Sequence, residues 1–252
     1  MIKVSDVYEC LDGICSFCEQ ESWDNSGLLV GDKDREVNRI AVVLDVNKST
    51  VEKALKKGVD LIVSHHPLIF RPKKTFTAES FEYKLAVNGV SLISCHTCFD
   101  SADGGVNDVL CSLLGMSDVY KLETADVARE LVRVGKISEI SGEEFARKVS
   151  EILGGKVTLA DSGKTIKTVA VCTGSGGDFI PEILGAEIDA YVTGEASYHE
   201  MCDAKDDGLT VVCAGHFETE KPAMSMLEKR LSEKFEEIEF VRLDEICPFK
   251  YF

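Results

Sequence analysis

Short runs of aliphatic residues recur along this chain, and most are followed by a segment with helical spacing. Several runs are continuous rather than alternating, as in RIAVVLDV (39–46), which is typical of strands covered by helices on both faces. This alternation predicts an α/β protein with a three-layer α/β/α architecture. Strands are predicted at 39–46, 60–64, 90–95, 131–137, 156–160, 166–173, 188–193, 209–214 and 238–243. Helices are predicted at 4–18, 48–58, 79–88, 105–114, 142–153, 178–185, 196–205 and 219–235, with N-caps at Asn47 or Ser49, Asp103, Ser141 and Thr219.

The two halves of the sequence resemble one another. RIAVVLD, a helix and VDLIVSHH in the first half correspond to KTVAVCTG, a helix and IDAYVTGE in the second. The next strand then ends in a histidine with a carboxylate four residues later, as His96 and Asp100 or as His216 and Glu220. These matches predict a duplication with lobes at 1–137 and 138–252. No proline- or glycine-rich linker separates the halves, so we expect the lobes to be entwined.

Composition excludes several classes of function. A chain of 252 residues can bury a substantial core, and no run approaches the ~18 apolar residues of a membrane span. The first residues include Asp6, Glu9 and Asp12 and lack the apolar segment of a signal peptide. The formal charge of −16 would repel nucleic acid. The chain is therefore expected to be cytoplasmic, with neither membrane nor nucleic acid as a partner.

Ten cysteines without an export signal indicate reduced thiols rather than a disulfide framework. Two pairs have CxxC spacing, Cys15 with Cys18 and Cys95 with Cys98. The preferred interpretation is that they are small buried apolar residues. A zinc or iron–sulfur site ligated by these cysteines is the competing interpretation, which visible absorbance and thiol counting would test.

All five histidines, at positions 65, 66, 96, 199 and 216, lie at or just after the carboxyl ends of predicted strands. Ligands bind at that edge of an open α/β sheet. Carboxylates stand close by in the sequence at Asp100, Glu195 and Glu220. Together these residues indicate a metal site rather than unrelated structural histidines.

His65 and His66 are adjacent in LIVSHHPLIF (61–70). Successive side chains of a strand point to opposite sides, and Pro67 keeps His66 out of the helical conformation. We therefore expect each imidazole to face a different ion. Paired ions about 3.5–4 Å apart are a recurring hydrolytic device, and imidazole with carboxylate suits zinc, iron or manganese.

Six motifs occur in order along nearly the whole chain: WDNSGLLVGD (23–32), VVLDV (42–46), DLIVSHHPLIF (60–70), CHTCFDSADGGVND (95–108), TGEASYHE (193–200) and GHFETE (215–220). Together they resemble the Nif-three-like dinuclear metal-binding family, which is often described as GTP cyclohydrolase I, type 2. The resemblance implies two similar, intertwined α/β/α lobes and a ring-like homohexamer whose metal sites face an internal cavity. The domain inserted in some longer members has no room in this chain.

The resemblance also implies the metal ligands, which are intact here as His65, His66, Asp100, His216 and Glu220. It implies two divalent ions per chain. His66 and Asp100 would hold one ion and His65 and His216 the other, with Glu220 bridging them.

Other residues near these motifs are candidates for catalysis or support. His96 is expected to orient a ligand or to bind substrate. Glu195 and His199 are candidate acid/base groups, with a surface pair as the alternative. Asp24 and Asn25 either close over the site or form an Asx turn, and Asp45 either caps a helix or supports a ligand.

The resulting hypothesis is a metal-dependent hydrolase of the GTP cyclohydrolase I type 2 kind. In that chemistry a metal-bound hydroxide would attack the carbon between the two imidazole-ring nitrogens of guanine, opening the ring and releasing formate. A dinuclear phosphoesterase is a close variant. The alternative from another class is a non-catalytic regulatory or metal-handling protein that acts through protein partners, and an open coordination position on each ion would separate a catalyst from it.

Overall fold

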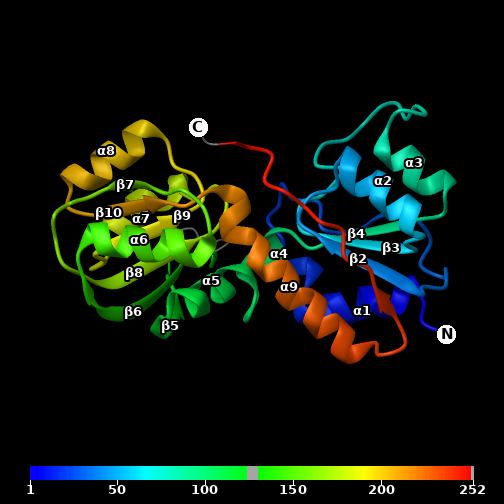
Figure 1. The fold of residues 1–252 in the computed structure, drawn as a ribbon, viewed down its shortest axis with the longest axis horizontal. Coiled ribbons are helices and arrows are strands. Elements are labelled where there is room, and N and C mark those ends of the chain that lie inside the picture. Colours follow the sequence, from blue (N-terminus) through cyan, green and yellow to red (C-terminus); the bar gives the residue numbers. More distant parts are fainter. Residues whose placement is uncertain (124–129, 251–252) are drawn as a thin grey trace. The chain divides into compact units, whose positions relative to one another are not determined.

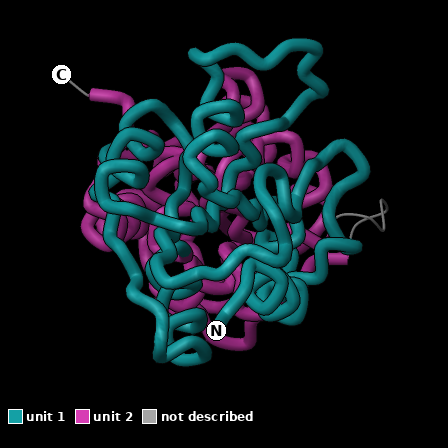
Figure 2. The backbone as a smooth tube through the Cα atoms, turned by 90° about the vertical axis from the view of Figure 1, so that its right-hand side faces the viewer, with its two compact units in different colours: residues 1–102, 224–246 teal, residues 103–223, 247–252 magenta. Residues whose placement is uncertain are grey.

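The computed structural model describes residues 1–123 and 130–250. The chain divides into two compact units, and each is built from two segments of the sequence (Figure 2). Unit 1 comprises Met1–Ala102 and Met224–Ile246, and unit 2 comprises Asp103–Ala223 and Cys247–Phe252. The units are thus interleaved along the sequence, as the prediction of entwined lobes requires. The lobes were predicted at 1–137 and 138–252. These bounds differ from those of the two units, and the division into such lobes stays a prediction.

Unit 1 contains a five-stranded mixed sheet in the order β1-β4-β3-β2-β11. Strands β2, β3 and β4 of this sheet are labelled in Figure 1. Its strands are β1 (Gly27–Val30), β2 (Arg39–Val43), β3 (Leu61–Ser64), β4 (Ser91–Ser94) and β11 (Glu239–Phe240). Its helices are α1 (Val4–Ile14), the 3₁₀ turn η1 (Phe17–Glu19), α2 (Lys48–Lys57), α3 (Phe81–Val87) and α4 (Thr97–Ser101). Side chains of α2 and α3 pack on one sheet face, where Ala54 and Leu85 meet Ala41, Val43 and Ile62.

Unit 2 contains a six-stranded mixed sheet in the order β5-β6-β8-β9-β10-β7. Its strands are β5 (Ser117–Lys121), β6 (Arg133–Ile140), β7 (Thr158–Ala160), β8 (Ile166–Cys172), β9 (Ala190–Thr193) and β10 (Thr210–Cys213). Its helices are α5 (Val106–Leu114), α6 (Gly142–Leu153), η2 (Gly177–Phe179), α7 (Ile180–Leu184) and α8 (Tyr198–Asp206). Helix α9 (His216–Lys234) begins in unit 2 and ends in unit 1.

Alternate residues of β8 enter the two cores of unit 2. Val169 and Val171 pack with α5 and α6 on one face. Ala170 and Cys172 pack with α7 and α8 on the other face. A strand that is buried on both faces needs apolar residues at every position. This requirement explains the continuous apolar run from which the strand at 166–173 was predicted. The three-layer prediction is confirmed for this unit.

Each predicted strand and helix occurs, but three short elements were missed. Strand β5 has no buried residue, burial along β1 does not alternate, and α4 has five residues, so their periodic signals are weak. Asn47 and Ser141 are N-caps, as predicted. The predicted cap Asp103 is wrong, because Gly105 occupies the N-cap of α5. The prediction of Thr219 as an N-cap is wrong as well. The Thr219 hydroxyl donates hydrogen bonds to the carbonyls of Gly215 and His216 within the first turn of α9.

The strand order confirms the duplication. In unit 1, β2, β3 and β4 are parallel neighbours, and β1 adds to β4 antiparallel. In unit 2, β8, β9 and β10 are likewise parallel, and β7 adds to β10 antiparallel. The outer neighbours differ, since β11 is parallel to β2 whereas β6 is antiparallel to β8. The repeat therefore covers four strands and not the whole of each sheet.

Asp60 and Asp189 occupy equivalent positions directly before β3 and β9. The Asp60 carboxylate accepts the amides of Asn38 and Arg39 at 2.9 and 3.0 Å. The Asp189 carboxylate accepts the amides of Lys167 and Thr168 at 2.9 and 2.7 Å. Each carboxylate thus fixes the backbone near the start of the preceding parallel strand, which is β2 for Asp60 and β8 for Asp189.

We expect Asp60→Ala and Asp189→Ala to lower the free energy of unfolding by similar amounts, about 1–2 kcal/mol each, because each removes a charged acceptor from two backbone amides. Urea unfolding followed by circular dichroism measures both losses. Asp206→Ala, which removes an exposed carboxylate at the end of α8, is the control. A loss in one unit only would contradict the equivalence.

The two His-x3-carboxylate endings are not at equivalent positions, although they contributed to the prediction of a repeat. The last paired residues are Ser94 in β4 and Cys213 in β10. His96 is the second residue after its strand, and His216 is the third. The amides of Asp100 and Thr219 close the corresponding turns onto His96 and Gly215. His96 is therefore the N-cap of α4, whereas His216 is the first residue of α9.

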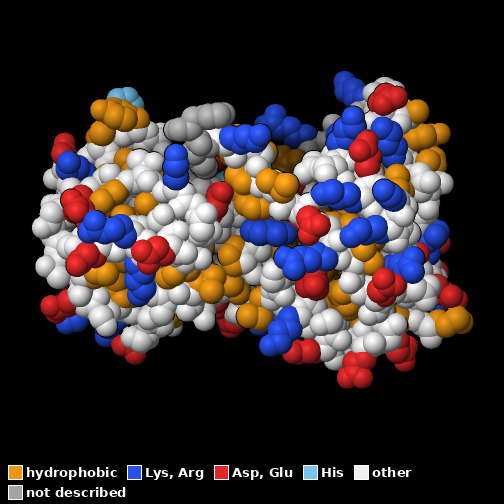
Figure 3. Space-filling view, in the orientation of Figure 1, with side chains coloured by type: hydrophobic (Ala, Val, Ile, Leu, Met, Phe, Trp, Pro, Cys, Tyr) orange, Lys and Arg blue, Asp and Glu red, His pale blue; other side chains and the backbone are white. Residues whose placement is uncertain are grey.

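None of the helices in the described ranges is long and apolar enough to cross a membrane. On the face drawn in Figure 3, acidic and basic side chains are interspersed, which is typical of a solvated surface.

Candidate functional site

His65 follows β3 directly and is completely buried. Its amide continues the pairing of β3 with β2 by donating to the carbonyl of Val43. The ring nitrogen Nδ1 lies 2.8 Å from the carbonyl oxygen of Cys95. A carbonyl can only accept, so Nδ1 carries the proton of the neutral ring and the lone pair lies on Nε2.

His66 is anchored by a carboxylate. Its Nδ1 lies 2.8 Å from Oδ1 of Asp45, so the structure supports the interpretation of Asp45 as a supporting residue. Glu245 in turn accepts the amides of Leu44 and Asp45 at 2.9 and 3.0 Å. Glu245 is about 200 positions away in the sequence, and no local pattern could have identified it.

We expect Asp45→Ala to weaken zinc binding about 10- to 100-fold, because the carboxylate fixes the ring orientation and tautomer of His66. Titration against a chromophoric chelator measures the affinity. Asp34→Ala removes an exposed carboxylate of unit 1 and serves as the control. Unchanged affinity in Asp45→Ala would show that His66 is not a ligand.

His96 is held in the same way by Asp24, with 2.8 Å between Nδ1 and Oδ1. The other oxygen of this buried carboxylate accepts the amide and hydroxyl of Thr97 at 3.0 and 2.6 Å. Burial alone would raise the pKa of Asp24, but the hydrogen bonds from His96, Thr97 and the Asn25 amide lower it well below its ordinary value. Asp24 is therefore a charged support for His96, and its Oδ1 also accepts the backbone amide of Asn25.

The three histidines of unit 1 come together. Each offers a ring nitrogen, and these atoms lie within 4.8 Å of one another. The rings of His65 and His66 have centroids 5.0 Å apart, and those of His65 and His96 are 5.2 Å apart. Because every Nδ1 faces an oxygen acceptor, each neutral ring has its lone pair on Nε2. This arrangement fits a divalent transition metal, whose histidine ligands donate their other N–H to a carboxylate or carbonyl.

Asp100 lies beside this histidine cluster on α4. Its Oδ1 is 3.5 Å from Nε2 of His65. Within unit 1 Asp100 thus lies beside His65, and the sharing of one ion by Asp100 and His66, which the resemblance implies, stays a prediction. The cause of this position is the short helix α4, whose first turn is closed by the Asp100 amide on the carbonyl of His96.

Unit 2 carries a second histidine–carboxylate set at the start of α9. Nε2 of His216 lies 3.2 Å from Oε1 of Glu220, one helical turn later. Nδ1 of His216 lies 3.3 Å from Oε2 of Glu195. Glu220 is almost fully buried, and an added Cβ at Gly174, whose φ is +64°, would collide with its carboxylate. The predicted residues His216, Glu220 and Glu195 are therefore neighbours.

His199 differs from the other four histidines. It lies exposed on α8, and its described ring contact is with Tyr198, whose centroid is 5.4 Å away. Glu195 precedes that helix and faces His216 instead. The structure therefore does not bring His199 to the Glu195–His216 pair through any described contact.

The structure gives no support to a zinc or iron–sulfur site ligated by cysteines. Cys15, Cys95 and Cys98 are buried, whereas Cys18 is exposed. Within the described ranges, the groups of three or more ligand atoms within 4.8 Å contain no cysteine. Small buried apolar residues remain the better interpretation of three of these positions.

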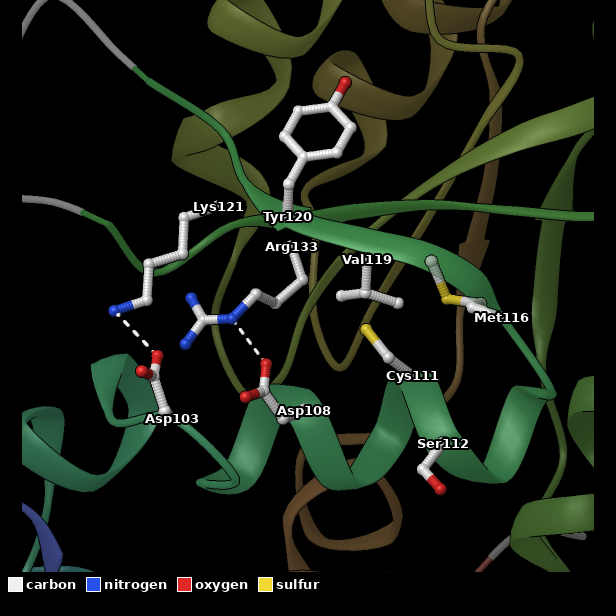
Figure 4. Close-up of a pocket in the computed structure, with 9 residues that line it drawn as sticks. All are labelled: Asp103, Asp108, Cys111, Ser112, Met116, Val119, Tyr120, Lys121 and Arg133. Carbon is white, nitrogen blue, oxygen red and sulfur yellow. Dashed lines mark hydrogen bonds and ion pairs between the residues drawn. The ribbon is translucent and has the colours of Figure 1, made fainter.

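A separate cavity of about 550 Å³ lies in unit 2 between α5 and β5 (Figure 4). The predicted site residues are absent from its lining. The buried guanidinium of Arg133 is paired with Asp108 at 2.5 Å, and Lys121 with Asp103 at 3.2 Å. These ion pairs connect β5 and β6 to the segment around α5, so they have a structural role.

Comparison with known proteins identifies a family. The model of the Duf34/NIF3 (NGG1p interacting factor 3) family matches residues 2–248. The GTP cyclohydrolase 1 type 2 homolog of Clostridium perfringens is 30% identical, over 99% of this chain and 100% of the relative. The protein of the same description from Campylobacter jejuni is 32% identical over 100% of both chains.

Solved structures share the fold. Staphylococcus aureus protein SA1388 superposes with a TM-score of 0.89 at 25% identity, covering 100% of this chain and 99% of the other. Reduced HcgD from Methanocaldococcus jannaschii gives a TM-score of 0.86 at 29% identity, covering 97% and 98%. The similarity extends over both units.

Proposed function

The chain belongs to the Duf34/NIF3 family, and from this premise we propose that it is a metal-dependent hydrolase that opens the imidazole ring of a guanine nucleotide. The observation that carries the proposal is the anchoring of the three histidines that are proposed as ligands. Nδ1 of His65, His66 and His216 faces an oxygen acceptor in each case. Second-sphere anchoring of this kind accompanies histidines that bind metal.

Five residues would hold the metal: His65, His66 and Asp100 of unit 1, and His216 and Glu220 of unit 2. Two divalent ions per chain, of zinc, iron or manganese, are part of the proposal. Imidazole and carboxylate donors suit these ions, and the histidine–carboxylate sets are consistent with them. A bound ion would supply Lewis acidity and lower the pKa of water at the site to about 7.

The chain's own residues would orient the reactants and move protons. Glu195 lies beside His216 with its side chain half exposed, so it can exchange protons with solvent and is assigned the acid/base role. His96 is held rigidly by Asp24 and is assigned to substrate contact. His199 was an equal candidate from the sequence, but its exposed position on α8 makes it the weaker one.

The reaction consumes two water molecules and involves no redox step. The first water adds to the ring carbon between the two imidazole nitrogens, and the bond from that carbon to the glycosidic nitrogen breaks. A formamide remains on the other nitrogen, and the glycosidic nitrogen takes up a proton. The second water cleaves the formamide, which releases formate and leaves a primary amine. The relatives described as GTP cyclohydrolase 1 type 2 homologs support GTP as the first substrate to test.

The test is formate release from GTP by protein loaded with zinc, iron or manganese, with metal content measured on the same samples. Glu220→Ala should abolish turnover, and Glu237→Gln, an exposed residue after α9, should not. Release of phosphate in place of formate would favour a dinuclear phosphoesterase. Two bound ions without turnover of GTP by any of these metals would overturn the assignment and favour a metal-handling role. The mass of the loaded protein checks the homohexamer that the family resemblance implies.

A further inference from the structure

A cavity of about 290 Å³ adjoins His216 in unit 2. His216 and Glu195 form one part of its wall, and Glu218 and Phe249 form another. The volume is at the low end of the roughly 300–1,000 Å³ found for ligand pockets. It fits a single fused ring system better than a whole nucleotide.

Glu218 is placed at this cavity by two glycines. An added Cβ at Gly155 would lie 2.9 Å from Cγ of Glu218, and one at Gly215, whose φ is +89°, would collide with the carboxylate. The side chain of Glu218 therefore packs directly against the backbone of Gly155 and Gly215, where glycine has no side chain. Burial and this neighbouring carboxylate raise the pKa of the Cys247 thiol. A carboxylate offers about four acceptor positions, so Glu218 can accept two N–H donors of a ligand.

Phe249 contributes an aromatic face. Its side chain is 65% exposed although it lines the cavity. A planar base stacks on such a ring, which is a favourable and sequence-tolerant contact. Lys156 on the same wall offsets part of the negative charge of Glu195 and Glu218.

Resting on the proposed function, we propose that Glu218 recognises the N1–H and N2–H₂ donors of a guanine ring stacked on Phe249. A carboxylate accepts two adjacent N–H donors in one plane, and these charge-assisted bonds are the strong ones. That edge of guanine lies opposite the imidazole ring, whose carbon is attacked. Glu218 and His216 line the same cavity from one turn of α9. A guanine held at its N1/N2 edge by Glu218 directs its imidazole ring toward His216.

Glu218→Gln provides a sharp test, because an amide offers one donor and one acceptor. That pattern matches the N1–H and C2 carbonyl of xanthine and no longer matches the N1–H and N2–H₂ donors of guanine. Binding of GTP, ITP and XTP to the zinc-loaded protein is measured by calorimetry. The wild-type chain should bind GTP about tenfold more tightly than ITP, which lacks the N2 amino group. Glu218→Gln should lose about 10- to 100-fold in GTP affinity and prefer XTP.

Two further variants separate base recognition from a general loss of binding. Phe249→Ala should weaken GTP and XTP alike, by about tenfold, and Glu237→Gln should change neither. An unchanged order of the three nucleotides in Glu218→Gln, with zinc content preserved, would overturn the recognition by Glu218 while leaving the hydrolase proposal intact. A zinc-loaded wild-type chain that binds none of the three would overturn both.

Discussion

His65→Ala should reduce zinc affinity by about a hundredfold or more, the largest effect expected of any single substitution in unit 1. His65 is completely buried, its Nδ1 is committed to the carbonyl of Cys95, and its Nε2 lies 3.5 Å from Asp100. Loss of an anchoring partner alone costs 10- to 100-fold in such sites, and loss of the ligand itself removes a metal bond. Competition with a chromophoric chelator and metal analysis of the purified protein measure the change.

His199→Ala is the matched control for this experiment, because it removes an exposed histidine. Its zinc content should equal that of the unsubstituted chain. Thermal unfolding of both variants without metal shows whether the His65 substitution damages the fold. Equal zinc affinity in His65→Ala and His199→Ala would refute the metal site in unit 1.

Asp108→Asn should lower the free energy of unfolding of unit 2 by about 3 kcal/mol. The guanidinium of Arg133 is 2% exposed, and its Nε donates to Asp108 at 2.5 Å (Figure 4). The second oxygen of Asp108 accepts the amide of Gly104 at 2.6 Å. The substitution weakens both bonds and removes the Asp108 charge from beside the buried guanidinium, and breaking a buried ion pair on one side costs about 3–5 kcal/mol.

Asp118→Asn is the control, because it breaks an ion pair of the same unit that is exposed on both sides. Asp118 and Lys136 are 3.2 Å apart, with side chains 69% and 57% exposed. Such pairs contribute about 0–1 kcal/mol. Urea unfolding monitored by circular dichroism compares the two variants, and equal losses would contradict the structural role of the buried pair.

The alternation of apolar runs and helical segments was sufficient to predict the three-layer α/β architecture, and the resemblance between the two halves predicted the duplication. Strands such as β8 need apolar residues on both faces, and that requirement is visible in the sequence. Strand β5 has no buried residue and burial along β1 does not alternate, so both had weak signals and were missed, whereas the edge strands β7 and β11 were predicted. The N-cap of α5 was wrong because a glycine backbone, rather than the side chain of Asp103, begins that helix.

The candidate ligands were likewise visible, because histidines at strand ends are rare enough to be informative and their motifs resemble a known family. The residues that hold these ligands in place could not be identified from the sequence. Asp45 and Asp24 could equally have been turn residues, and Glu245 lies about 200 positions from the loop that it holds. Only the folded chain shows which acceptor faces each Nδ1.

The sequence by itself determined which side chains are available for metal and which layers bury the strands, since both depend on residue type and short-range periodicity. The tertiary structure decided which carboxylate accompanies which histidine. A one-residue offset separates His96 from His216 in the repeat, and α4 places Asp100 beside His65. These pairings depend on distances between segments far apart in the chain, which spacing along the sequence does not contain.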